Sequence, residues 1–470
     1  MEIEEGSETR ELEWKKIRTR FMVELKKVVI IAAPMVASSM LQNLLQVVSV
    51  IMVGHLNKLS LSSVSIATSI TNVSGFSILS GMAGGIETLC GQAYGAGQFE
   101  KLGIYTYTAV ISLAMVCAPI TVLWIFIDKI LIFIGQDPEI SIKARTYALW
   151  LIPGLFGSAI LKPLTRFFQT QSILSPMIIS SLIGLCFHGV ACWVLVFKLA
   201  LGSVGTAIAF SLGIWLNVVI LLYFVKYSSA CERTCVPFSK KAFLGFREFF
   251  ALAVPSAAMI CLKWWACEVI FLLAGLLSNP ELETSVLSIC MSISTLHFTI
   301  SFGLGAATST RVSNELGAGN PKAGHFSVCT GMILAVIEVV IVIIILFGCR
   351  YVLGYAFTHD NALVHYVAVM TPFLCASIFT DSLQGVLSGA AKGSGWQRVG
   401  AYVNLIAFYL LGIPVGVVLG FIVHFKAKGL WMGIVCGSIV QTIFLSIINA
   451  RTDWKKQATM ARERVFHDAT

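Results

Sequence analysis

The chain has 470 residues, of which 57% are hydrophobic and only 12% are charged, and its mean hydropathy is +0.85. A soluble domain carries roughly 25% charged residues, so this composition excludes an ordinary soluble fold. The net charge of +9 is accounted for by loops that flank a membrane, as described below, and it gives no reason to expect a nucleic-acid partner.

The apolar residues form long blocks, and a helix of about 20 such residues crosses the hydrocarbon core of a bilayer. A β-barrel would instead show short alternating segments. The sequence therefore predicts an all-α membrane protein with about twelve transmembrane helices. In chain order the spans lie near residues 28–52, 61–85, 104–127, 141–161, 173–196, 203–225, 249–276, 284–308, 325–348, 362–389, 399–423 and 429–449.

Three polar segments flank or separate the predicted spans. The segment 1–25 is charged and lacks the apolar core of a cleavable signal peptide, so we expect an N-terminal tail and insertion through the first span. The long hydrophilic stretch 226–248 predicts a linker between two six-helix lobes, which occupy residues 26–225 and 249–450. A C-terminal tail follows over residues 451–470.

The distribution of positive charge predicts the orientation. Most of the 33 Lys and Arg residues fall in the termini and the even-numbered loops. Cytosolic loops carry such an excess, so both termini and the linker are expected in the cytosol. The 13 cysteines are scattered singly, apart from Cys231 and Cys235, which lack the second pair of a zinc site. We therefore expect no metal and no cofactor.

The second half of the chain repeats the first. Residues 75–81 read GFSILSG and residues 297–303 read HFTISFG. A nearly constant offset also relates the pairs Gly81 and Gly303, Thr88 and Thr310, Tyr147 and Tyr366, and Pro153 and Pro372. Each half has an even number of spans, so the halves run parallel and are related by an axis along the membrane normal. A site between such halves can face either side of the membrane.

Two glycine-rich strings narrow the choice of family. Residues 81–97 read GMAGGIETLCGQAYGAG, and residues 309–321 read STRVSNELGAGNP. Together with VGHL at 53–56 and GSGWQ at 393–397, they resemble the multidrug and toxic compound extrusion (MATE) family, specifically its plant detoxification branch. Read physically, the glycines permit tight reversals and close helix approach, and Asn-Pro stops a helix.

The resemblance implies a secondary active exporter that moves xenobiotics or other organic solutes out of the cytosol in exchange for protons. It implies small solutes, cationic or amphiphilic, protons and membrane lipids as partners, no catalytic activity, and a monomer in the plasma or vacuolar membrane. The chain has no phosphate-binding loop of the type GxxxxGK[ST], which excludes direct ATP hydrolysis.

Charged residues inside spans are the candidates for coupling, because each costs about 2.5–3.5 kcal/mol to insert. Asp381 in the tenth span is the strongest, and the resemblance implies an acid here that exchanges protons. Lys263 in the seventh span departs from the family, whose plant and animal members usually carry glutamate before the Trp-Trp pair. A lysine here would attract Asp381 or Glu268 and oppose their protonation. Glu268, five residues further along, need not face the same cavity.

Candidate solute contacts come from polar and aromatic residues. Trp264 is either an anchor at the membrane interface or a wall of the cavity, where an aromatic face beside acids would hold a planar cation. Asn43 and Gln46 are polar groups of the first span, which has no acid, and Asp381 completes the predicted set. His188, His297 and Glu338 are left without a role, and Lys162 is read as a lysine at a helix end whose charge reaches the cytosolic surface.

Other functions remain open at this point. Lys263 raises the alternative of an uncoupled carrier, or of one selective for anions or neutral conjugates. A lipid-linked oligosaccharide flippase of related fold would require several cations in its cavity. An intramembrane prenyl transferase would show acidic clusters, and a channel would show a filter loop or a ring of charges; the sequence shows neither.

Overall fold

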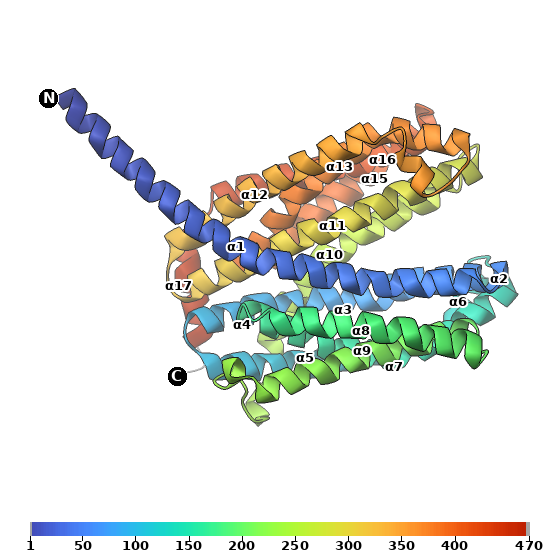
Figure 1. Cartoon of the computed structure of the whole chain (residues 1–470), viewed down its shortest axis with the longest axis horizontal. Coiled ribbons are helices and arrows are strands. Elements are labelled where there is room, and N and C mark those ends of the chain that lie inside the picture. The colour runs from blue at the N-terminus through green and yellow to red at the C-terminus, as the bar shows by residue number, and fades with distance from the viewer. Residues whose placement is uncertain (1, 467–470) are drawn as a thin grey trace.

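The protein is described by a computed structural model that covers residues 2–466 (Figure 1). Residue 1 and residues 467–470, the outer ends of the two predicted tails, lie outside the described residues. Within residues 2–466 the regular structure is helical, with no strand. Twelve of the described helices are long and apolar enough to cross a membrane. The predicted fold class is therefore confirmed.

The helices form two groups that follow one another in the chain. The first comprises α1 (Glu2–Gly54), α2 (Lys58–Thr71), α3 (Ser77–Met82), α4 (Gly84–Gly95), α5 (Phe99–Ile125), α6 (Ile127–Phe133), α7 (Pro138–Thr170), α8 (Ser175–Trp193) and α9 (Ser203–Tyr227). The second comprises α10 (Phe246–Ala274), α11 (Pro280–Gly317), α12 (Pro321–Gly348), α13 (Asn361–Ser394), α14 (Gln397–Asn404), α15 (Ile413–Val417) and α16 (Lys426–Ala450). The terminal helix α17 (Trp454–Phe466) follows them.

Wider π-helical turns interrupt several spans, at Asn72–Phe76, Val194–Lys198, Leu405–Gly412 and Val418–Ile422. A π turn shifts the hydrogen bonding of the helix and often marks a functional position. The first of them joins α2 to α3. Its Val73 carbonyl accepts a hydrogen bond from Trp265 Nε1 of α10 at 3.3 Å, which ties the two helix groups together.

The structure gives both predicted tails a definite form. The polar N-terminal segment is the first part of α1, a helix of 53 residues. Such a helix is about 80 Å long, far longer than a bilayer core, and Figure 1 shows it extending beyond the bundle. The C-terminal segment forms α17, whose Ala458 and Ala461 pack against Val312 and Leu316 of α11.

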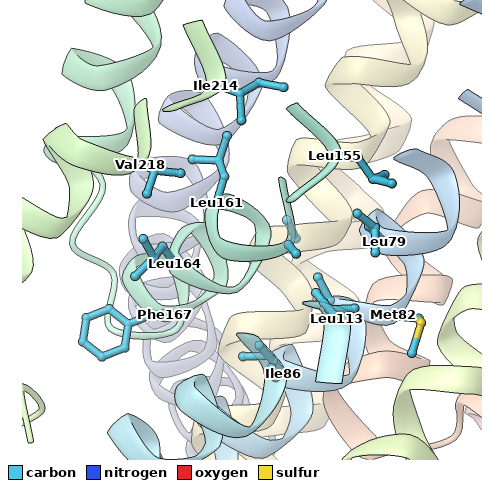
Figure 2. Close-up of a cluster of buried hydrophobic side chains, with 14 of the residues drawn as sticks. Leu79, Met82, Ile86, Leu113, Leu155, Leu161, Leu164, Phe167, Ile214 and Val218 are labelled. Atoms are coloured by element: carbon cyan, nitrogen blue, oxygen red, sulfur yellow. The ribbon is translucent and has the colours of Figure 1, made fainter. Parts of the chain in front are cut away.

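The two groups converge at the end that carries α4 and α17, called here the α17 end, and diverge toward α2 and α6 (Figure 1). A large apolar core fills the first lobe and extends across to residues of α10, α11, α12 and α13. Leu79, Ile86, Leu113 and Leu155 come from four different helices of this core and point into its interior (Figure 2). A separate core fills the second lobe around Trp431 and Met370.

Contacts between the lobes mirror one another. Gly81 of α3 lies against the backbone of Ala257 of α10, and its repeat partner Gly303 of α11 lies against Val36 of α1. A side chain at either glycine would collide with the facing helix, so close approach requires glycine there. Equivalent contacts on both sides are those expected of two halves related by an axis along the bundle.

Candidate functional site

An ion pair lies in the middle of the second lobe. Lys263 Nζ of α10 is 2.7 Å from Asp381 Oδ1 of α13 and donates a second hydrogen bond to Gln384 Oε1 at 3.0 Å. Ser438 Oγ of α16 donates to the same Asp381 oxygen at 3.4 Å. The lysine and aspartate side chains are only 12% and 10% exposed. Three helices therefore hold one buried, neutralised pair.

The local sequence explains how α13 presents these groups. Asp360 caps the helix by accepting a hydrogen bond from Ala362 N at 2.9 Å, and Gly395, with φ +90°, ends it. The helix between them is long enough to carry Asp381 deep into the lobe. Residues three apart share one face of a helix, so Asp381 and Gln384 both reach Lys263.

An aromatic wall borders the pair. The ring of Phe298 on α11 lies 5.8 Å from Lys263 Nζ, and Trp264 packs edge-on against the same ring with centroids 5.3 Å apart. A cation over an aromatic face is attracted by its quadrupole, so Phe298 adds to the stabilisation of Lys263. The predicted residue Trp264 therefore lies near the ion pair, and Phe298, which no sequence pattern singled out, contacts both Trp264 and Lys263.

The other predicted site residues lie elsewhere. Glu268 is on α10 but turned toward the first lobe, where it faces Ser69 of α2. Gln46 of α1 donates to Asn72 Oδ1 at 3.3 Å and lines a cavity of about 20 Å³ inside the first lobe. Asn43 is partly buried on the same helix. The predicted set is thus divided between the lobes.

A second titratable cluster was not anticipated as a unit. His297 Nε2 of α11 lies 3.2 Å from Glu338 Oε1 of α12. Ser382 Oγ of α13 donates to the other Glu338 oxygen at 2.7 Å and lies 3.2 Å from His297 Nε2. Glu338, left without a partner by the sequence, is therefore paired. The three members of this cluster come from three different spans, and no spacing in the sequence relates them.

A third cluster joins the lobes. Arg166 Nη1 of α7 is 2.9 Å from Glu87 Oε1 of α4, and Lys392 Nζ of α13 is 3.9 Å from the other Glu87 oxygen. Both cations face the ring of Phe302 on α11, at 5.2 Å and 5.9 Å from its centroid. All three charged side chains are more than nine-tenths buried. The Glu87 carboxylate therefore contacts two cations, one from each lobe.

Hydrogen bonds between the lobes close the α17 end. Thr88 Oγ1 donates to the Lys392 carbonyl at 2.5 Å, and Gln92 Nε2 donates to the Gly393 carbonyl at 3.1 Å. Arg464 Nη1 of α17 reaches Gln92 Oε1 at 2.7 Å. Among residues 2–466, no group of three or more His, Cys, Asp or Glu is placed to hold a metal.

Comparison with known proteins decides the family. The family model MatE matches residues 34–194 and 255–418, one stretch in each half of the chain. The chain belongs to the MATE family. Among Arabidopsis thaliana proteins, it is 49% identical to Protein DETOXIFICATION 12 over 96% of this chain and 94% of that protein. It is 52% identical to Protein DETOXIFICATION 3 over 94% and 93%.

A solved structure agrees. The crystal structure of the eukaryotic MATE transporter AtDTX14 superposes with a TM-score of 0.92 at 50% identity, covering 95% of this chain and 100% of that one. The resemblance predicted from the glycine-rich strings is therefore confirmed. This MATE protein is a multi-pass membrane transporter that moves small organic solutes, and it is not an enzyme.

Proposed function

We propose that this MATE transporter is a secondary active exporter that carries organic solutes out of the cytosol by alternating access, in exchange for protons. The observation that carries the proposal is the buried Lys263–Asp381 pair. A proton and Lys263 compete for the same carboxylate oxygen, so protonation of Asp381 releases the lysine from α13. That exchange links proton binding to a rearrangement of α10 against α13.

The arrangement of the lobes supports the same proposal. They are joined at the α17 end and diverge toward α2 and α6 (Figure 1). If both termini lie in the cytosol, as the loop charges predict, the closed end is cytosolic and this is an outward-facing state. Glu268 is a second candidate for proton exchange, since it faces Ser69 of the first lobe and its surroundings would change when the lobes rock. We propose a monomer in the plasma or vacuolar membrane.

A second candidate is an uncoupled carrier, or one selective for anions or neutral conjugates. Lys263 favours it, because a lysine that already neutralises Asp381 removes the negative charge that would attract an organic cation. The flippase alternative has less support. Relatives near 50% identity along almost the whole chain carry detoxification names, and this favours export of solutes.

Export from proteoliposomes distinguishes the candidates. The purified chain is reconstituted, a pH gradient is imposed, and movement of the fluorescent cation ethidium is followed. The proposal expects wild-type flux that requires a counter-gradient of protons and an Asp381→Asn variant that no longer responds to it. Lys198→Gln, which changes an exposed lysine of the first lobe, is the matched control and should behave as wild type.

Each remaining outcome has a definite meaning. A gradient response that appears only in Lys263→Glu supports the second candidate, because the natural chain is then uncoupled. A response in wild type that persists in Asp381→Asn assigns the coupling to another group, with Glu268→Gln as the next variant. Absence of flux for ethidium and for a fluorescent anion in every form would contradict the export proposal itself.

A further inference from the structure

A partly buried lysine on α7 has no partner. Among the described residues, Lys162 makes no ion pair and no side-chain hydrogen bond. It does not end its helix, because α7 continues to Thr170, and so the expectation of a lysine at a helix end is wrong. A charge held inside the bundle without a partner costs free energy, which makes it a candidate for ligand binding.

The neighbours of Lys162 show which way it faces. Arg166 lies four residues further along α7 and therefore on the same face of the helix. That arginine contacts Glu87 and the Phe302 ring of the second lobe, and it donates to Gln169, whose amide donates in turn to the Ala306 carbonyl of α11 at 3.1 Å. The face of α7 that carries Lys162 is thus the face turned toward the other lobe.

The charges on this interface do not balance. Lys162, Arg166 and Lys392 carry three positive charges, and Glu87 is the carboxylate that contacts two of them. The charged group that acts on Lys162 is Arg166, which repels it. A bound anion would relieve that repulsion and complete the pairing, whereas a bound cation would add to it.

The repeat relates Lys162 to a position that belongs to a neutral pair in the second lobe. The offset that relates Pro153 to Pro372 also relates Lys162 to Asp381. In the second lobe the charge at this position is cancelled by Lys263, and in the first lobe the lysine stands uncancelled. Counted with Lys263, the two equivalent positions carry a net positive charge, as a site for an anion requires.

We propose that Lys162 binds the anionic group of the exported solute, a carboxylate, sulfate or phosphate ester, with Arg166 and Lys392 supplying further positive potential. This inference rests on the proposed export function and assigns it a solute class. The headgroup of an anionic lipid offers the same chemistry, so the experiment uses vesicles of phosphatidylcholine alone, and adds a second set with anionic lipid.

The test measures binding and flux separately. Equilibrium binding of carboxyfluorescein and of ethidium to the purified full chain is measured by fluorescence anisotropy, and flux of both dyes is measured in phosphatidylcholine vesicles. Lys162→Gln should weaken carboxyfluorescein binding about tenfold or more, since a hydrogen bond to a charged group is worth roughly that factor, and leave ethidium binding unchanged or stronger. Lys162→Arg should retain the preference for the anion.

Lys198→Gln is again the control and should leave both dyes unaffected. Equal losses for both dyes in Lys162→Gln, or the same loss in the control, would overturn the assignment. If Lys162→Gln does not purify as a single species, wild type and Lys162→Arg carry the test, because both must bind carboxyfluorescein more tightly than ethidium. An anion preference seen only with anionic lipid would overturn the solute assignment in favour of lipid.

Binding needs no transport, so the two proposals can fail independently. Anion binding that depends on Lys162 without flux of either dye would support the site and contradict export. Flux of the dyes together with carboxyfluorescein binding that does not depend on Lys162 would support export and overturn the site.

Discussion

Neutralising Lys263 alone should destabilise the protein more than neutralising Lys263 and its partner Asp381 together. Two unit charges 2.7 Å apart attract by about 6 kcal/mol at an effective dielectric constant of 20, before desolvation is subtracted. Both side chains are about nine-tenths buried, so Lys263→Met leaves an unpaired buried carboxylate. Breaking a buried pair in this way typically costs about 3–5 kcal/mol, whereas replacing both charges by neutral groups is often nearly neutral.

The assay is thermal unfolding of the purified full chain in detergent, followed by loss of its monodisperse chromatographic peak. We expect Lys263→Met to unfold at the lowest temperature. The double variant Lys263→Met with Asp381→Asn should recover most of the loss, because its asparagine carries no charge and still bonds Ser438. Lys198→Met, which removes an exposed lysine lying 5.3 Å from the Trp193 ring, is the control.

Two results would refute this reasoning. If Lys263→Met unfolds no earlier than the Lys198→Met control, the pair contributes no stability and its charges are solvated in solution. If the double variant is less stable than Lys263→Met, the loss comes from packing around the lysine stem and not from an unpaired Asp381.

Two further predictions follow from close packing and from burial outside the spans. Gly317→Ala should cost about 1–3 kcal/mol in the same unfolding assay, because its methyl group would meet the Gln92 backbone of the other lobe, and Gly348→Ala, which has open space around it, should cost little. Burial raises the pKa of Cys231 to about 11. Maleimide at pH 7 should therefore label the exposed Cys235 and spare Cys231, and labelling of Cys231 should rise as the pH approaches 11. Peptide mass spectrometry measures the labelling of each thiol. Equal labelling of both thiols at pH 7 would contradict the burial of Cys231.

The spans were predictable because hydropathy is a property of long local segments. Each of the twelve predicted spans coincides with one described helix that is long and apolar enough to cross a membrane. The predicted spans 104–127, 173–196, 249–276 and 399–423 run past an end of that helix by one or two residues. Their ends were not predicted well, because the helices continue past the membrane until a local stop. The span near 284–308 belongs to α11, which begins at Pro280 after Asn279 and ends at Gly317. These stops lie in polar sequence that hydropathy alone assigns to loops.

The site was predictable only where charge itself gave the signal. A lysine and an aspartate buried in different spans of one lobe each require a partner. Lys263 pairs with Asp381 and not with Glu268, the other acid that the sequence analysis considered. The choice depends on helix rotation, since Glu268 lies on the side of α10 that meets Ser69. Glu338 carries the same signal, but its partners His297 and Ser382 could not be predicted, because the three residues lie on three different spans and no spacing in the sequence relates them.

The repeat constrains the backbone more strongly than the charges. Gly81 and Gly303 make mirrored contacts because any side chain would separate the helices, and both halves must pack against each other in the same way. Lys162 and Asp381 occupy equivalent positions without any such steric demand, and they carry opposite charges. Packing therefore preserves the symmetry between the lobes, and the charged positions are free to differ from one lobe to the other, as the proposed binding of an anionic solute at Lys162 requires.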